Sequence, residues 1–93
     1  MELPVKYDEL SVPLKKTVRE QYVIEQGGDC YYCSSSLKLP PPKEILQKKV
    51  NKDLFPNGFF RWPVHLHHSH DTGLTIGAVH NYCNAVLWQY HGE

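Results

Sequence analysis

The chain has 93 residues, the length of one small domain. Ten basic residues balance ten acidic ones, so the overall charge does not indicate a nucleic-acid binder, and any such surface must come from local clustering. Three cysteines exclude a fully paired disulfide framework within the chain. No apolar run approaches the roughly 20 residues that span a bilayer, and residues 1–16 lack the apolar stretch of a signal peptide. We therefore expect one domain, residues 1–93, without membrane contact, in a reducing cytoplasm where thiolates bind metal.

The first part of the chain predicts an arm, a helix and a tight turn. Residues 1–12 have no clear periodicity and predict an irregular arm. A helix is expected from Pro13, since proline suits a first helical turn, and Gly27-Gly28 should end it. Its apolar stripe would consist of Leu14, Val18 and Tyr22, which are spaced by four residues. Residues 29–36 then predict a Cys-x-x-Cys turn.

The second part predicts a strand, a turn, a second strand and a helix. After three prolines, the expected elements are a short helix at 43–52, a strand at 59–66, a turn at 71–73, a return strand at 74–79 and a closing helix at 81–90. Pro63 within the first strand implies an edge or a bulge. Helices outside a hairpin of this kind predict an α+β fold.

Two half-sites have the spacing of zinc ligands. They are Cys30-x-x-Cys33 and His80-x-x-Cys83. Two ligand pairs, each separated by two residues, are typical of a tetrahedral structural zinc site. A redox Cys-x-x-Cys or ordinary buried residues are the alternatives, but a redox pair favours a thioredoxin-like context, and this one follows a Gly-Gly helix stop. We predict a zinc ion that joins the upstream turn to the last helix.

Three segments together resemble the HNH nucleases, most closely the recombination endonuclease VII-like subgroup found mainly in phages. They are Gln26–Cys33 (QGGDCYYC), His67–Gly73 (HHSHDTG) and His80–Asn84 (HNYCN). The resemblance covers about residues 14–91 and leaves residues 37–58 as an insertion. It implies a ββα-metal finger, in which a hairpin and a helix clasp one divalent cation with zinc behind it. In this chain that core would follow an N-terminal helix.

The resemblance also implies residue roles. His68 would be the general base, His67 and Asn84 would bind the catalytic metal, and His70 would be an auxiliary catalytic residue near the scissile phosphate. The reaction would be metal-dependent hydrolysis of DNA phosphodiester bonds, by nicking or double-strand cleavage, with 5′-phosphate and 3′-hydroxyl ends. In a phage the setting would be the host cytoplasm.

The chain departs from the subgroup at two positions. His80 stands where the family usually has a cysteine, and His67 stands where the subgroup usually has aspartate. An imidazole in place of a carboxylate makes the catalytic site softer, so we expect Mn²⁺, Co²⁺ or Ni²⁺ to be more effective than Mg²⁺.

Elementary geometry restricts both sites. Neighbours in a regular strand point to opposite faces, so the strand must end or bend for His67 and His68 to serve one site. On a helix, Cys83 and Asn84 lie about 100° apart, so one can face zinc while the next faces a second metal.

Several residues also have plainer interpretations. His68 and His67 could be surface or hydrogen-bonded histidines, Asn84 could be a capping residue, and His65 could face solvent or DNA. His91 could share the helical face of Asn84. Phosphate contacts could come from Lys48, Lys49, Lys52 and Arg61, although a solvated helix face explains the lysines equally well. The aromatic residues Phe59, Phe60, Trp62 and Trp88 are expected in the core rather than as base-stacking groups.

Two other functions compete with the endonuclease. A non-catalytic zinc module could bind DNA or a protein and would need no general base at position 68. A junction-resolving enzyme would need two active sites and hence a dimer, for which the sequence shows no obvious dimerisation helix. The expected partner is the DNA phosphate backbone.

Overall fold

The computed structural model describes residues 2–92, so Met1 and Glu93 of the predicted domain lie outside the description. Its elements, in chain order, are η1 (Tyr7–Glu9), α1 (Val12–Glu25), α2 (Lys43–Leu46), η2 (Lys52–Leu54), β1 (Val64–His68), β2 (Thr75–His80) and α3 (Asn81–His91). The two strands pair antiparallel. The predicted α+β class is therefore confirmed, with a hairpin followed directly by a helix. Within residues 2–92, no helix combines the length and apolar character needed to cross a bilayer.

Helix α1 has sequence signals at both ends. The Ser11 side chain accepts a hydrogen bond from the Leu14 backbone N–H, and a proline occupies the first turn. After Glu25, Gly27 has φ of +69°, a conformation that glycine adopts without steric cost. Val18 is fully buried, but Leu14 is 41% exposed, so the predicted apolar stripe includes one residue too many.

The first strand starts later than predicted. The aromatic run at 59–62 forms turns, because the amides of Phe59 and Arg61 bond to carbonyls three residues earlier. β1 begins only after Pro63 and continues through His68. The strand predicted at 59–66 is therefore correct in topology and wrong at both ends.

The hairpin is irregular at the point where the sequence required it. His67 pairs with Gly77 and His68 pairs with Thr75, so the register shifts between the two histidines. β1 ends at His68. A bulge at a strand end changes where the last side chain points, which is the deviation that the two adjacent histidines predicted.

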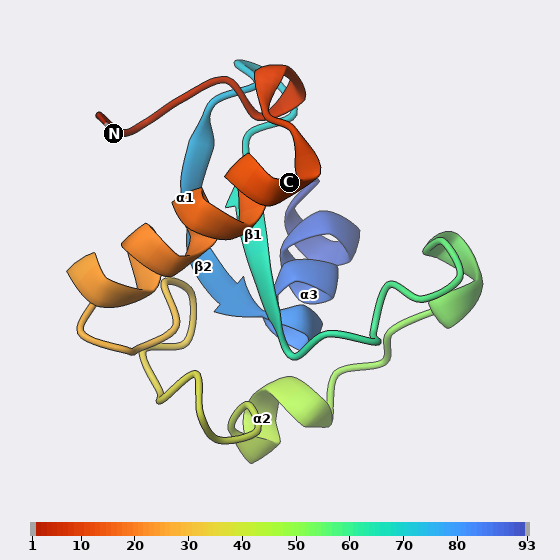
Figure 1. Cartoon of the computed structure of the whole chain (residues 1–93). Coiled ribbons are helices and arrows are strands. Elements are labelled where there is room, and N and C mark those ends of the chain that lie inside the picture. The colour runs from red at the N-terminus through yellow and green to blue at the C-terminus, as the bar shows by residue number, and fades with distance from the viewer. Residues whose placement is uncertain (1, 93) are drawn as a thin grey trace.

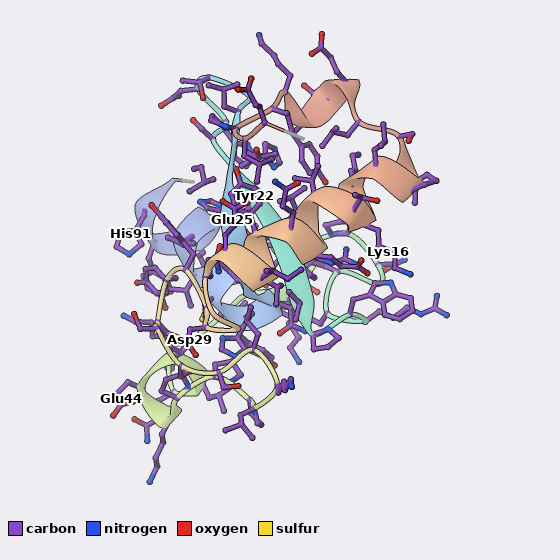
Figure 2. The ribbon with its side chains drawn as sticks, turned by 60° about the vertical axis from the view of Figure 1, so that its left-hand side comes forward. Lys16, Tyr22, Glu25, Asp29, Glu44 and His91 are labelled. Atoms are coloured by element: carbon purple, nitrogen blue, oxygen red, sulfur yellow. The ribbon has the colours of Figure 1, made fainter. Side chains whose placement is uncertain are left out.

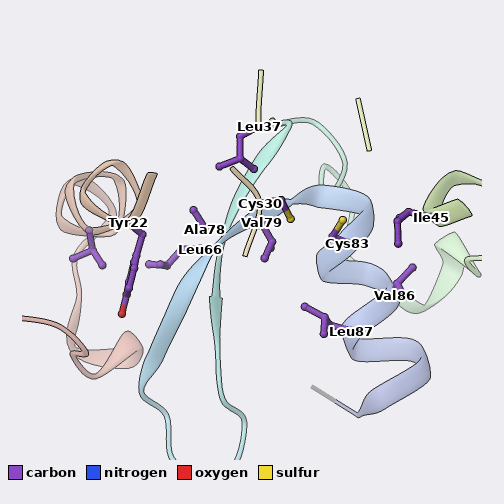
Figure 3. Close-up of a cluster of buried hydrophobic side chains, with 11 residues drawn as sticks. Tyr22, Cys30, Leu37, Ile45, Leu66, Ala78, Val79, Cys83, Val86 and Leu87 are labelled. Atoms are coloured by element: carbon purple, nitrogen blue, oxygen red, sulfur yellow. The ribbon is translucent and has the colours of Figure 1, made fainter. Parts of the chain in front are cut away.

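The hairpin lies between α1 and α3 (Figure 1). Leu66 and Ala78 face Tyr22 of α1, whereas Val79 lies on the side of Cys83 and Leu87 (Figure 3). The predicted insertion adds Leu37 and Ile45 to the same core, each 7% exposed. The segment 37–58 thus packs as part of the domain, with α2 one turn long rather than extending over 43–52.

Gln26 fastens the end of α1 to the sheet. Its amide accepts from the Ala78 N–H at 2.9 Å and donates to the Ala78 carbonyl at 2.9 Å. A Cβ atom at Gly77 would lie 2.7 Å from the Gln26 oxygen and 3.1 Å from the Tyr31 side chain, so a larger residue would displace the Gln26 amide from these bonds.

The N-terminal arm is more ordered than the sequence predicted. Thr75 donates its N–H to the Val5 carbonyl, and Tyr7 donates its N–H to the Gly73 carbonyl, both at 2.9 Å. Lys6 forms an isolated antiparallel β-bridge with Leu74. The arm therefore crosses the turn end of the hairpin (Figure 1) and delivers Tyr7 to the end of β1.

Candidate functional site

Four residues from three segments converge on one group. Cys30 and Cys33 lie in the turn after α1, His80 ends β2, and Cys83 lies in the first turn of α3. One ligand atom from each residue lies within 4.8 Å of every other. The four residues predicted from spacing are the four that the fold brings together, and they could hold a structural zinc ion.

The distances fit a tetrahedral ion. Nδ1 of His80 lies 3.4 Å from Sγ of Cys33 and 3.6 Å from Sγ of Cys83. Zinc bonds of about 2.3 Å to sulfur and about 2.0 Å to nitrogen place tetrahedral ligand atoms roughly 3.5–3.8 Å apart. These two distances therefore match those expected around zinc, and all four ligand atoms lie within 4.8 Å of one another.

His80 is held in the ligating tautomer. Its Nε2 lies 3.0 Å from the Ser36 carbonyl and 2.9 Å from the Leu39 carbonyl. A carbonyl only accepts, so Nε2 carries the proton and Nδ1 keeps its lone pair toward the cysteines. Ligating histidines commonly donate their other N–H to a backbone carbonyl. These contacts identify His80 as a member of the group rather than a bystander.

The cysteine turn is built by backbone hydrogen bonds. The Cys30 amide donates to the Ser35 carbonyl at 2.8 Å, and the Ser34 amide donates to the Cys30 carbonyl at 3.0 Å. Ser34 has φ of +67°, which closes the turn. The Tyr31 amide bonds to Ala78, so the turn is attached directly to β2.

Charge is unevenly divided between the buried thiols. The hydrogen bond from Cys83 lowers the pKa of Cys30 to about 4. The same contact raises the pKa of Cys83, and burial and the nearby sulfurs raise it further. A second thiolate is therefore costly in this space unless a cation offsets the repulsion, which is the chemistry that a bound metal supplies.

A separate groove is lined by residues of the N-terminal arm, α1, β1 and α3. Its volume is about 850 Å³, and its lining includes His65, His68, His70 and Asn84. It includes three of the four sequence-predicted catalytic-site residues, namely His68, His70 and Asn84. The fourth, His67, is 2% exposed and is not among the lining residues.

His68 sits within a stack of rings. The Tyr7 ring lies parallel to it at 3.8 Å, with an interplanar angle of 8°. His70 stacks at 5.0 Å, and the Lys15 ammonium lies over Tyr7 at 4.3 Å. Burial lowers the pKa of His68, and the charge of His70 lowers it further. The ring is thus kept neutral and able to accept a proton near pH 7.

The Asn84 side chain contacts His65 of β1. Its Nδ2 lies 3.2 Å from Nδ1 of His65. Residues two apart on a strand share a face, so His65 and His67 both point toward the α3 side of the hairpin. Burial lowers the pKa of His65, which keeps its Nδ1 available to accept from the amide.

The cations of the groove come from α1. This helix was predicted from the sequence, but its basic residues were not considered as part of a site. Lys15, Lys16 and Arg19 of α1 line the groove. The signal was present in their spacing, because residues 15, 16 and 19 share one helical face. In Figure 2, Lys16 lies beside α1, on the side of the view opposite His91.

Two lysines that were considered for phosphate contacts, and His91, which was considered for the helical face of Asn84, contact other residues. Lys48 lies over the Tyr90 ring and Lys52 over the Phe60 ring. His91 lies 3.2 Å from the Tyr32 hydroxyl, at the far side of the molecule from Lys16 (Figure 2).

The prediction that both tryptophans belong to the core is wrong. Trp62 is 64% exposed and Trp88 is 40% exposed. Both line the groove.

The two candidate sites share one helix end. Cys83 is buried in the metal-ligand group, whereas Asn84, the next residue, lines the groove. The turn of about 100° per residue explains how adjacent side chains serve both. No protein-family model, curated protein or solved structure matches the chain.

We expect the purified protein to carry about one zinc ion per chain and to unfold when a strong chelator removes it. Cys33→Ser should lose most of the zinc and lower the melting temperature, because it removes one of four ligands. Metal analysis and circular dichroism measure the two effects. His91→Ala is the control, since it removes a histidine outside the group. A Cys33→Ser protein with full zinc content and wild-type stability would contradict the assignment.

Proposed function

We propose that the chain is a metal-dependent endonuclease of the HNH type that hydrolyses DNA phosphodiester bonds and leaves 5′-phosphate and 3′-hydroxyl ends. One observation carries the proposal. A neutral, stacked histidine, His68, lies at the end of β1 in a groove that also holds Asn84 and a row of cations. Hydrolysis of a phosphodiester needs a base, a cation for the phosphorane and help for the departing oxygen.

His68 supplies the base. The stack with Tyr7 fixes the plane of its ring, and the lowered pKa keeps the lone pair free for the proton of the attacking water. His70 lies next to it, where it would contact the scissile phosphate.

Asn84 supplies one metal ligand. Its Nδ2 is held by Nδ1 of His65, so its Oδ1 is left for a cation. The second ligand in the proposal is His67, which lies on the same strand face as His65. His65 thus acts as a positioning residue for the amide, in the way that outer partners orient metal ligands. The bound cation would stabilise the phosphorane and the leaving 3′ oxygen.

The cations of α1 supply the phosphate contacts. Lys16 is exposed, while Lys15 and Arg19 are half-buried along the same wall of the groove. Each phosphate that they neutralise would add salt dependence to DNA binding.

We expect His68→Ala to reduce plasmid nicking in Mn²⁺ by about 10²-fold or more, because general base catalysis contributes roughly that much. Zinc content and the circular dichroism spectrum should stay as in the wild type. His91→Ala is the matched control, because it removes a histidine outside the groove. A wild-type rate in His68→Ala would refute the base assignment. Absence of nicking by the wild-type protein would favour a non-catalytic zinc module that binds DNA or a protein.

We expect Mn²⁺, Co²⁺ or Ni²⁺ to support faster cleavage than Mg²⁺, because the proposed ligands are an imidazole and an amide, without a carboxylate. The measurement is a titration of each cation against the zinc-loaded protein. A clear optimum with Mg²⁺ would rule out the proposed ligand set.

We expect His65→Ala to raise the Mn²⁺ concentration for half-maximal nicking by about 10- to 100-fold, because outer-sphere partners of metal ligands have effects of this size. The rate at saturating Mn²⁺ should recover to near the wild-type value, since His65 acts only through Asn84. His70→Ala is the comparison and should lower the saturated rate instead. An unchanged Mn²⁺ requirement in His65→Ala would exclude the positioning role.

A further inference from the structure

One wall of the groove is made of exposed apolar residues. Trp62 is 64% exposed, Leu54 is 50% exposed and Trp88 is 40% exposed, and all three line the same 850 Å³ space. Large apolar side chains left together on a surface mark a binding site. The catalytic chemistry proposed above makes no use of them.

This wall is held rigidly. Phe55 packs against Phe59 at 4.6 Å and against Trp88 at 5.4 Å between ring centroids. The Asn81 side chain donates to the carbonyls of Phe60 and Trp62 at 3.1 and 3.0 Å. The aromatic loop is thus fixed to the start of α3, and the surface exists before any partner binds.

The part of the groove lining that α1 contributes carries three cations. They are Lys15, Lys16 and Arg19, and the lining residues in the described part of the chain include no aspartate or glutamate. In a chain with no net charge, this is a local concentration of positive charge. The complementary partner carries regularly placed negative charges and flat apolar groups.

Single-stranded DNA has this combination. Sites for single strands combine a positive track for the backbone with aromatic rings on which bases stack. In a duplex the bases are already stacked and paired, so the faces that Trp62 and Trp88 would contact are covered. A space of about 850 Å³ is within the roughly 300–1,000 Å³ of sites for small ligands, which suits a few nucleotides.

We propose that the groove binds single-stranded DNA, with unpaired bases on the ring faces of Trp62 and Trp88 and with phosphates along α1. This inference rests on the proposed nuclease function, because the strand would then pass His68. The substrate would therefore be an unpaired strand rather than an intact duplex.

The test is fluorescence anisotropy with a labelled oligothymidylate of about 12 nucleotides and with a matched duplex, on zinc-loaded protein without a catalytic cation. The single strand should bind at least about ten-fold more tightly than the duplex. Trp62→Ala should weaken single-strand binding by about 5- to 100-fold, because one base loses its stacking partner. Trp62→Phe should restore most of the affinity. Tyr90→Ala should bind as the wild type, since Tyr90 is an exposed aromatic residue outside the groove.

Equal binding of the duplex, or wild-type affinity in Trp62→Ala, would overturn the inference. So would failure to bind DNA, the result expected if the groove receives an acidic protein instead. Cleavage of both substrates in Mn²⁺ is measured separately. Cleavage that is insensitive to Trp62→Ala leaves the nuclease proposal standing without the strand site. Binding through Trp62 without cleavage of either substrate removes the nuclease proposal and leaves the strand site.

Discussion

The structure depends on the convergence of Cys30, Cys33, His80 and Cys83 within 4.8 Å. The sheet has only two strands, and an isolated hairpin is marginally stable in water. A chain of this length buries a modest core, so a metal that joins the turn after α1 to the start of α3 would supply stability that packing alone lacks. The bonds of Gln26 to Ala78 reinforce the same junction from the side of α1. The metal-ligand group fixes how the hairpin and α3 are placed relative to each other.

The groove depends on the same placement of α3 against the hairpin. Asn84 follows Cys83, so the residue that anchors α3 in the metal-ligand group also sets the rotation of α3 about its axis. A small rotation of α3 would move the Asn84 amide away from His65, whose Nδ1 lies 3.2 Å from it. In the proposed nuclease, Asn84 would gain the precision of the neighbouring zinc ligand, since supporting contacts determine how closely a site holds its geometry. Two adjacent residues would then serve the scaffold and the chemistry.

Local spacing in the sequence was enough to predict the four-residue metal-ligand group, the hairpin with its irregular end and the closing helix. The signal for each is local, since even the distant halves of the metal-ligand group each carry a pair of ligands separated by two residues. The other features depend on residues far apart. Tyr7 reaches His68 through backbone pairing of the arm with the hairpin turn, which no periodicity in residues 1–12 signals. Trp62 and Trp88 have the composition of core residues, but Trp62 follows the turns at 59–62 and Trp88 lies on the groove face of α3, and both are exposed. Local propensity could not predict either outcome, since tertiary contacts decide both.

The segments outside the hairpin and α3 give the groove its character. The hairpin contributes His68, but the arm contributes the Tyr7 ring that covers it, α1 contributes the cations, and the loop before β1 contributes the aromatic wall. A hairpin and helix alone would leave the His68 ring open to water, and its pKa would lie nearer the ordinary value because burial is the main cause of the shift. The same segments narrow an open surface to a groove with one charged and one apolar side. In the proposed nuclease, the catalytic groups and the groups that would select the substrate are thus separable, because different parts of the sequence supply them and they meet at the end of β1.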